Sequence, residues 1–448
     1  MPSKDSPSTG SANKTRRDVL GALTIDLTPL KASRDYRMLF TGQFVSGFGS
    51  ALSYVVLPWQ MYQLTKSSFA VGMLGVVEFV PMFLAAFVGG ALADYIDRRR
   101  LIFLSEFGLT FCCAVLVANS LLAQPQAWVL FVVAALFAAF NGIHRPALES
   151  LTPRLVDPQH LPAVSALSSL RYNFNFIIGP AVAGVIAASL GAAVAFAIDA
   201  ATFIISIITL LLIRSVPAPA AADRASLRSV IEGLRYARSR QELLGTYLID
   251  LNAMFFGMPT ALFPALAESF GGVAVGLFYS MPAVGSLAVT LTSGWTKRIH
   301  KHGLAVTIAA AVWGLAIIAF GMASRLEVAL LFLAMAGGAD MVSGLFRMTI
   351  WNQTIPDHLR GRLASIEMIS YMTGPYLGNG EAGLVASLFG LRASVVSGGA
   401  LCVVGSGLLA FLLPAFLRYD GREGLARKQA EEAERARHVN NQRGALPF

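Results

Sequence analysis

Apolar segments of about 20 residues follow one another along most of the chain, and short polar breaks separate them. A segment of this length crosses the hydrocarbon core of a bilayer as an α-helix, whereas a surface helix of a soluble protein keeps one polar face. Hydrophobic residues make up 55% of the 448 residues and charged residues only 14%, so the chain lacks the polar side chains that a water-exposed surface needs. The sequence therefore predicts an all-α membrane protein.

Windows of about 20 apolar residues predict twelve transmembrane helices in two pseudo-symmetric bundles of six. The first six are expected at residues 37–64, 69–93, 101–123, 127–150, 162–190 and 193–213. The second six are expected at residues 243–270, 272–296, 303–324, 328–352, 361–388 and 392–417. The predicted domains are an N-terminal tail (1–35), a first bundle (36–214), a basic linker (215–241), a second bundle (242–418) and a C-terminal tail (419–448).

Basic residues concentrate in alternate breaks, and this indicates how the chain is oriented in the membrane. These breaks hold Arg98 to Arg100, Arg154, Arg214 to Arg240, Lys297 with Arg298, and Arg360 with Arg362. Because such loops stay cytoplasmic and the span count is even, we expect both termini in the cytoplasm of a bacterium, with the chain in its inner membrane. The loops also account for the net charge of +9, so no nucleic-acid partner is expected.

The linker between the two predicted bundles carries basic residues with apolar residues among them. Arg224, Arg228 and Arg235 are interleaved with Leu227 and Ile231 at spacings of three to four residues. This pattern predicts either a basic amphipathic helix on the inner leaflet or a solvated charged linker.

The two halves of the sequence repeat the same landmarks about two hundred residues apart. Pro81, Arg145 and the pair Gly179 and Pro180 in the first half are echoed by Pro282, Arg347 and the pair Gly374 and Pro375 in the second. Parallel repeats related by an axis along the membrane normal are typical of transporters that hold cargo at the interface between their halves. The repeat therefore predicts alternating access.

The second basic break reads Gly-Ala-Leu-Ala-Asp-Tyr-Ile-Asp-Arg-Arg-Arg over residues 90–100 and resembles the signature loop of the major facilitator superfamily. A topology signal alone would explain the arginines, but not the glycine and the aspartate at their spacing. The resemblance implies a conformational latch formed by Gly90, Asp94, Arg98 and Arg99.

Gly179, Pro180 and Gly184 in the fifth predicted span are similar to the glycine-proline motif of exporters in this superfamily. Proline removes a backbone donor and glycine permits close packing, so this helix can act as a hinge. The alternative is ordinary small-residue packing between helices.

From residue 36 to the last span the chain most resembles the enterobactin exporter family, in particular at Leu262 to Glu268, Val275 to Tyr279 and Leu291 to Gly294. This resemblance implies export of a small organic molecule such as a siderophore. Macrolide and multidrug efflux proteins look nearly as similar, so a pump with broad cargo is the alternative.

Ionisable side chains inside membrane spans are costly and are therefore candidate functional residues. The deepest are Glu78, Arg171, Asp340 and Glu367. The repeat places Arg171 opposite Glu367, which predicts a charge pair between the halves. Asp340 and Arg347 are seven residues apart and share a helix face, which predicts either a structural pair or a proton site beside a cation.

Four other acidic residues lie nearer the ends of spans, where exposure at the membrane interface explains them: Asp199, Glu106, Asp250 and Glu381. Polar amides on the first, fifth, seventh and eleventh spans are expected to line a cargo cavity and to orient the cargo. These amides are Gln43, Asn173, Asn175, Asn252 and Asn379.

No phosphate-binding loop of an ATPase occurs in the chain, so transport must be secondary, and proton antiport through Glu78 or Asp340 is expected. An intramembrane enzyme would need a nucleophile with a base or a metal cluster, and the six histidines lack that spacing. We therefore expect no enzyme activity, no metal and no cofactor. The expected partners are a small-molecule cargo, protons and the lipid bilayer, and the expected state is a monomer; nutrient import is the less favoured rival.

Overall fold

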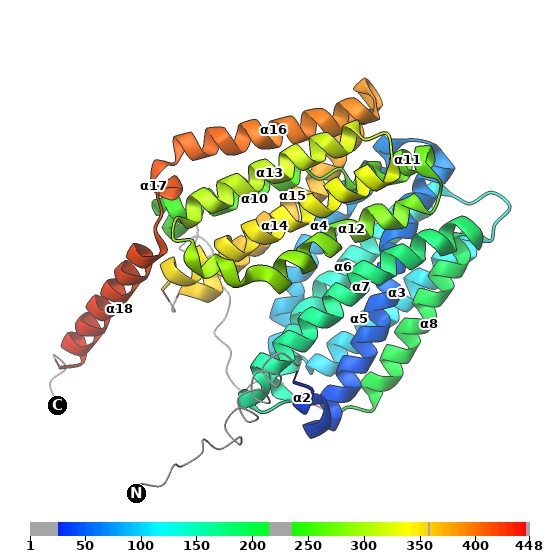
Figure 1. Ribbon diagram of the computed structural model, residues 1–448. Coiled ribbons are helices and arrows are strands. Elements are labelled where there is room, and N and C mark those ends of the chain that lie inside the picture. Colours follow the sequence, from blue (N-terminus) through cyan, green and yellow to red (C-terminus); the bar gives the residue numbers. More distant parts are fainter. Residues whose placement is uncertain (1–25, 215–234, 357–358, 445–448) are drawn as a thin grey trace, which may run out of the picture.

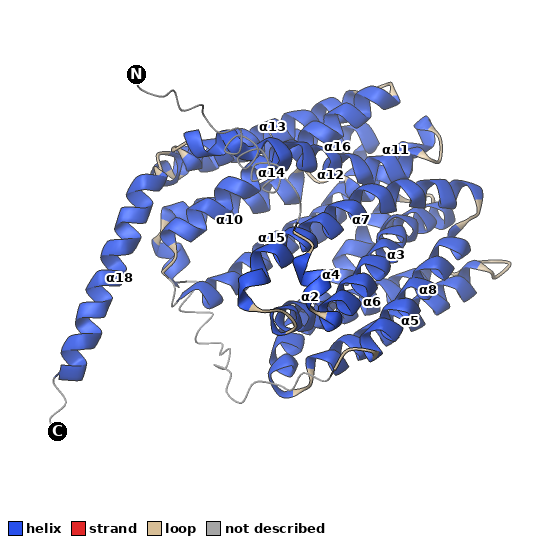
Figure 2. Ribbon diagram, turned by 60° about the horizontal axis from the view of Figure 1, so that its bottom comes forward, coloured by secondary structure: helices blue, strands red, loops and turns tan. Residues whose placement is uncertain are grey.

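The computed structural model describes residues 26–214, 235–356 and 359–444, and it is helical throughout these ranges apart from turns and one isolated β-bridge between Lys301 and Asp420. Figure 2 shows long helices that run side by side in a single body. Most of the predicted N-terminal tail and of the basic linker lies outside the described residues.

The first part of the chain forms six long helices preceded by a short one. They are α2 (Thr28–Ala32), α3 (Arg34–Thr65), α4 (Ser68–Tyr95), α5 (Arg98–Ser120), α6 (Ala127–Leu151), α7 (Leu161–Ser189) and α8 (Ala192–Leu211), with the turns η1 (Thr152–Arg154) and η2 (Pro158–His160) before α7. Polar side chains fix where three of them begin, because Ser33, Ser67 and Asp97 each accept a hydrogen bond from a free backbone N–H of the first turn.

The second part of the chain forms long helices interrupted by short ones. They are α10 (Gln241–Phe256), η3 (Thr260–Leu262), α11 (Phe263–Ala267), η4 (Glu268–Phe270), α12 (Ala274–Thr292), η5 (Ser293–Arg298), α13 (His302–Met322), α14 (Leu326–Thr354), α15 (Arg360–Phe389), α16 (Leu391–Leu412), α17 (Pro414–Leu417) and α18 (Gly421–Gly444). Gly271 and Gly390 precede α12 and α16 with φ of 96° and 94°, a backbone conformation that glycine adopts without strain.

Ten helical segments in the described residues are long and apolar enough to cross a membrane. Helices α3 and α15 are at least as long but are not among these ten. In α3 the polar side chains are inside the protein, since Gln43, Ser46, Ser53 and Gln60 are all buried. A helix that is surrounded by other helices can carry such residues, because its neighbours supply the hydrogen bonds that lipid cannot.

The predicted span at 243–270 is not one continuous helix, because α10 ends at Phe256. Pro259 has no backbone N–H to continue the helix, and side chains from other helices satisfy the freed groups. The indole Nε1 of Trp313 donates to the carbonyl oxygen of Gly257 at 2.9 Å, and Oδ1 of Asn379 accepts from the N–H of Ala261 at 3.0 Å. The sequence windows missed this break because its residues are as apolar as those of the helix.

Helices from the first part of the chain pack mainly on one another, and so do those from the second part. In the first part α3 packs on α7 and α8, α4 on α6, and α5 on α6 and α8; in the second, α10 packs on α15, α13 on α14 and α16, and α12 on α14. The two parts meet where α4 packs on α15 and α7 packs on α12, and we call these two contacts the seam.

The two ends of the molecule differ. We call the end with the Arg98, Arg154, Lys297 and Arg360 loops the basic end, and the other the opposite end. Figure 1 shows the helices of the two parts converging near α11, at the opposite end, and spreading apart toward α2 and α17, at the basic end.

Backbones approach closely at the seam because glycines face each other there. A Cβ atom added to Gly184 on α7 would lie 2.8 Å from the backbone N of Gly276 and from the carbonyl oxygen of Val273. A Cβ atom on Gly383 of α15 would lie 2.6 Å from the carbonyl oxygen of Ser68. Both glycines therefore permit contacts that no larger residue allows.

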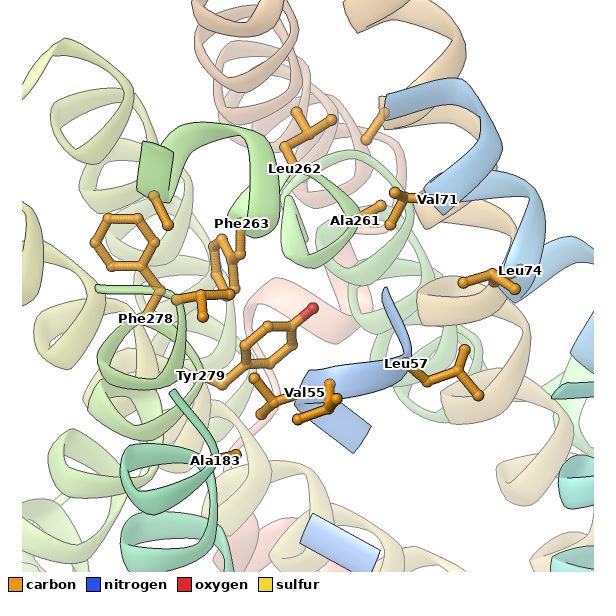
Figure 3. Packing of buried hydrophobic residues seen from close by; sticks show 14 of the residues in the cluster. Val55, Leu57, Val71, Leu74, Ala183, Ala261, Leu262, Phe263, Phe278 and Tyr279 are labelled. Carbon is orange, nitrogen blue, oxygen red and sulfur yellow. The ribbon is translucent and has the colours of Figure 1, made fainter. Parts of the chain in front are cut away.

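The buried apolar side chains show the same asymmetry. The largest cluster crosses the seam at the opposite end, and Figure 3 shows Tyr279 of α12 beside Val55 of α3 and Phe263 of α11. Toward the basic end the clusters separate. One contains only residues of the first part, such as Leu101 and Leu151, and two others contain only residues of the second part.

We predict that Gly184→Ala destabilises the protein, because the added methyl group meets backbone atoms of α12. Overpacking of this kind costs about 1–3 kcal/mol, which should lower the melting temperature in detergent by several degrees. Gly407→Ala on α16 is the matched control, since a Cβ atom there meets no atom within 4 Å. Equal melting temperatures for the two variants would contradict the close contact.

Candidate functional site

Glu78 lies on α4, three residues after Gly75. A Cβ atom added to Gly75 would come within 2.7 Å of the carbonyl oxygen of Tyr376 on α15, so this stretch of α4 lies at the seam. The carboxylate is close enough to interact electrostatically with the hydroxyls of Tyr54, Tyr279 and Tyr376, which come from α3, α12 and α15. We call Glu78 and these three tyrosines the seam cluster. No ion pair to Glu78 occurs within the described ranges.

Two rings of the seam cluster, Tyr54 and Tyr279, belong to one chain of ring contacts, whereas the Tyr376 ring contacts Phe79. The Tyr54 and Tyr279 rings are 5.3 Å apart at 76°, and Tyr54 also contacts Phe176 of α7 at 6.1 Å. Phe176 in turn contacts Tyr172 at 4.4 Å. Tyr54 is 45% exposed and Tyr172 60% exposed, so other side chains do not cover this part of the surface.

A second cluster surrounds Arg347 on α14, and we call it the arginine cluster. Its guanidinium forms an ion pair with Asp250 of α10, and Nη2 lies 3.6 Å from Oδ1 of Asp340. Glu367 of α15 is close enough to interact with the same guanidinium. The predicted Asp340 and Arg347 pair is present, and one arginine faces three acidic residues.

Asp250 corrects the expectation that it is explained by exposure near the end of a span. It is only 8% exposed and contacts Arg347 in the interior. The predicted span, 243–270, is longer than α10. Asp250 therefore lies near the start of the predicted span, although it lies near the middle of the helix.

Glu106 of α5 is a second correction, since it is completely buried. Its Oε1 accepts hydrogen bonds from Nε2 of Gln43 at 2.6 Å and from Oγ of Ser206 at 2.8 Å. Nε2 of His144 on α6 lies 3.4 Å away. Four helices of the first part thus converge on one carboxylate.

Asp199 of α8 is the third correction, and it is also completely buried. It accepts hydrogen bonds from Ser53 of α3 and from Thr202 of its own helix, and Sγ of Cys113 on α5 lies 3.5 Å away. One sequence signal could have found these two acidic residues. Each lies five or six residues inside its predicted span, at 101–123 and 193–213, which is more than one helical turn from the end.

The five amides expected to line a cargo cavity are bonded within the protein. Gln43 donates to Glu106, Asn175 to the carbonyl oxygen of Phe44 at 3.4 Å, and Asn252 to that of Cys402 at 2.9 Å. Oδ1 of Asn379 accepts from the N–H of Ala261 in η3. The amide of Asn173 donates to the carbonyl oxygen of Ser169, one turn earlier on α7. Each amide therefore bonds to a neighbouring helix or to its own, and the cargo-orienting role stays a prediction.

The predicted pair of Arg171 and Glu367 does not form among the described residues. Arg171 lies near Tyr36 of α3, whereas Glu367 lies near Arg347. The repeat gives the positions of the two residues along their helices. It does not show that the cation near Glu367 is Arg347, which belongs to the same part of the chain.

The predicted latch is partly described. The surroundings of Gly90 and the side chain of Asp94 are not described, and Arg98 is buried. Arg99 donates to the carbonyl oxygens of Leu210 at 2.9 Å and Leu211 at 2.7 Å, at the C-terminal end of α8. Arg99 thus satisfies orphan carbonyls at a helix end, whose negative dipole also favours a cation.

The predicted hinge motif lies at packed positions of α7. Gly179 faces Ala51 of α3, and Gly184 faces Gly276 across the seam. Pro180 sits inside the helix, as Pro375 does in α15.

In the part of the chain that the structure describes, no group of three or more His, Cys, Asp or Glu side chains lies close enough together to hold a metal ion. The three cysteines, Cys112, Cys113 and Cys402, are free and buried.

Comparison with protein families matches residues 24–447 to the family described as transmembrane secretion effectors. The enterobactin exporter EntS of Citrobacter koseri is 27% identical over 397 residues, which cover 88% of this chain and 95% of that protein. The EntS protein of Shigella boydii is 27% identical over 398 residues, with 87% and 94% coverage.

Solved structures of transporters share the fold. A variant of the nucleoside transporter NupG has a TM-score of 0.73 at 11% identity and covers 85% of this chain and 100% of its own. A bacterial homologue of the human lysosomal transporter Spinster, in an inward-facing and unoccupied conformation, has a TM-score of 0.65 at 14% identity, with 88% and 97% coverage. At these identities the likeness shows the fold alone.

We predict that Arg347→Met strongly destabilises the protein, because it leaves the Asp250 carboxylate buried without a counter-charge. Breaking a buried ion pair in this way costs about 3–5 kcal/mol, and thermal unfolding in detergent measures it. The double variant Asp250→Asn with Arg347→Met should recover most of the loss. Arg422→Met, which removes an exposed pair with Asp420, is the control and should leave the melting temperature unchanged; equal losses in both single variants would contradict the assignment.

Proposed function

The chain belongs to the transmembrane secretion effector family of the major facilitator superfamily and is a transporter, and we propose that it exports a small organic molecule by alternating access. In this proposal twelve helices span the membrane in two bundles, residues 36–214 and 242–418. The tails at 1–35 and 419–448 and the linker at 215–241 lie in the cytoplasm, on the same side as the basic end. The chain works as a monomer, since each bundle closes its own core at that end.

Two helices complete the count of twelve. Helix α3 packs on helices of its own part and contacts α12, and α15 packs on helices of its own part and on α4. Both therefore have the protein neighbours that polar spans need. The even count returns the chain to its starting side.

The single observation that supports alternating access is the arrangement of the buried apolar clusters. The largest cluster joins the two parts at the opposite end, a small cluster of Met82, Ala138 and Met372 joins α4 and α6 to α15, and separate clusters occupy each part at the basic end. Lys66 and Glu268 also join the parts at the opposite end, with Nζ 2.6 Å from Oε1. We infer an inward-facing state, closed at the opposite end.

The cargo proposal comes from the relatives. The similar proteins are named as enterobactin exporters, which favours a siderophore over a broad set of drugs. A multidrug pump remains the alternative. Import is disfavoured by the resemblance of Gly179, Pro180 and Gly184 to the motif of exporters.

Proton antiport is the proposed energy source. The carboxylates of Glu78 and of Asp340, in the arginine cluster, lie at or near the seam. A change in how the helices pack at the seam would therefore change the surroundings of both carboxylates. A carboxylate that alternates between a dry and a wet environment can bind and release a proton in each cycle.

Reconstituted liposomes with an internal pH dye test the function. An acid gradient is applied, and a catecholate siderophore or a lipophilic drug is then added. We expect cargo-triggered proton flux, and Glu78→Gln and Asp340→Asn should abolish it while Glu327→Gln, an exposed control at the start of α14, keeps it. Flux with drugs alone would identify a multidrug pump, and no flux from a folded protein with either class would contradict proton-driven export.

A charge swap tests the closed contact at the opposite end. Ser280, 3% exposed, donates to the carbonyl oxygen of Ile177 across the seam, so Ser280→Cys reports opening through its reaction with a maleimide. Lys66→Glu should raise the labelling rate a few-fold, because it replaces an exposed attraction of up to about 1 kcal/mol with repulsion.

The double variant Lys66→Glu with Glu268→Lys restores the attraction and should restore slow labelling. The native cysteines are buried and give a low background. Equal labelling of the single and double variants would show that the ion pair does not hold the seam closed.

A further inference from the structure

A cavity of about 380 Å³ opens at the basic end of the first part of the chain, and we call it the basic cavity. Three segments that lie far apart in the sequence form its walls: α2 with the start of α3, the connector before α7 (residues 152–160), and Arg214 just after α8. Figure 1 shows α2 at the basic end, where α3 begins and α8 ends. The volume lies in the range of small-molecule sites, which is about 300–1,000 Å³.

Packing and polar contacts within the protein hold the walls of the basic cavity in place. Oγ of Ser33 donates to the carbonyl oxygen of Leu155 at 2.6 Å and so ties the start of α3 to the connector. Leu155 and Tyr36 both belong to the buried apolar cluster of the first part. Nε of Arg214 lies 3.1 Å from Oδ2 of Asp35, which joins the end of α8 to α3. The cavity is therefore formed before any ligand binds.

The charged and titratable side chains around the cavity favour an anion. They are Arg34, Arg154, Arg214, His160, Asp35 and Asp157. The three arginines outnumber the two carboxylates, and the Arg214 side chain is 73% exposed although it contacts Asp35. A guanidinium carries five N–H donors, which is more than one carboxylate oxygen accepts. Arginine donors suit the oxygens of a phosphate group in particular.

An apolar stripe on α8 reaches the edge of the basic cavity. It consists of side chains that are about half exposed and lie three or four residues apart, on one face of the helix: Ile204, Ile208, Leu211 and Leu212. Leu212 lies only two residues before Arg214. In a bilayer such a stripe contacts acyl chains, whereas arginines collect at the level of the headgroups. The cavity therefore lies where the headgroup of a lipid meets its chains.

We propose that the basic cavity binds the phosphate group of an acidic phospholipid from the leaflet at the basic end, with the acyl chains along the α8 stripe. A free phosphate ion offers the same oxygens to the arginines but leaves the stripe without a ligand contact. The bound lipid joins the start of α3, the connector and the end of α8, and so stabilises the first part as a unit. The inference goes beyond export, because it involves neither the cargo nor the coupling ion.

Native mass spectrometry of the purified full-length protein in a non-ionic detergent measures the affinity for the first bound lipid. Phosphatidylglycerol is compared with phosphatidylcholine of the same acyl chains, which carries the phosphate without a net charge. Inorganic phosphate in large molar excess, at constant ionic strength, is the competitor. We expect phosphatidylglycerol to bind several-fold more tightly than phosphatidylcholine and to resist displacement by inorganic phosphate.

Either of two results would overturn the proposal. Displacement by inorganic phosphate would show a site for free anions. Equal affinity for the two lipids would show that the acyl chains alone account for binding.

The variant Arg34→Gln tests the contribution of charge. It should weaken the first phosphatidylglycerol binding about fivefold, the size of effect expected for one basic side chain near a lipid surface. Arg298→Gln is the matched control, since Arg298 is also exposed and at the basic end but does not line the basic cavity. Equal weakening in the two variants would mean that the lipid responds to the overall charge of the basic end, and no cavity site would be needed.

Two further variants separate a built site from a charged surface. Asp157→Asn removes a carboxylate from the wall and should strengthen phosphatidylglycerol binding several-fold. Ala32→Phe narrows the cavity without a change of charge and should weaken binding as much as Arg34→Gln does. Unchanged binding in Ala32→Phe would show that the lipid lies elsewhere.

Thermal unfolding in detergent gives a second readout that does not depend on transport. Phosphatidylglycerol should raise the melting temperature of the unmodified protein, because a ligand that binds only the folded state stabilises it. The rise should be smaller for Arg34→Gln and Ala32→Phe and unchanged for Arg298→Gln. Melting temperatures without lipid show that each variant is folded, and an equal rise in all of them would contradict binding at the basic cavity.

Discussion

The structure depends on one constraint, which is that a polar side chain inside a membrane helix must find its partner on another helix, because lipid offers none. Glu106 meets this requirement by joining α3, α6 and α8 to α5, and Asp199 by joining α3 to α8. Asp250 and Arg347 do the same for α10 and α14. These contacts hold each part of the chain together where no water-driven apolar attraction between helices is available.

The same constraint explains why the seam is built differently. Most of its contacts are glycine against backbone and apolar side chain against apolar side chain, as at Gly184 with Gly276, and they are joined by the Ser280 hydrogen bond and the exposed pair of Lys66 and Glu268. Such contacts can separate and reform without leaving a buried charge unpaired. The charged clusters that would be costly to break lie within one part, so rigid-body motion of one part against the other leaves them intact.

Glu78 lies at the seam and not inside one part of the chain. Among the described residues it has no hydrogen bond or ion pair of the kind that Glu106, Asp199 and Asp250 have. A protein tolerates such a group where a proton or a ligand completes it for part of the cycle. The arginine cluster differs, because three acidic residues share one arginine that remains in place.

The sequence by itself determined the helical membrane class, the positions of most helices and the landmarks at Gly179, Pro180 and Asp340, because apolar length and helix periodicity are local properties. It could not show that α10 ends at Phe256 or that Glu106, Asp199 and Asp250 are interior residues, since burial depends on which helices become neighbours. It also predicted a cargo-orienting role for Gln43, Asn252 and Asn379, and only the tertiary structure shows that their amides bond to other helices. Such partners lie far apart in the chain, 163 residues for Gln43 and Ser206, so only the packed structure decides which polar groups are satisfied.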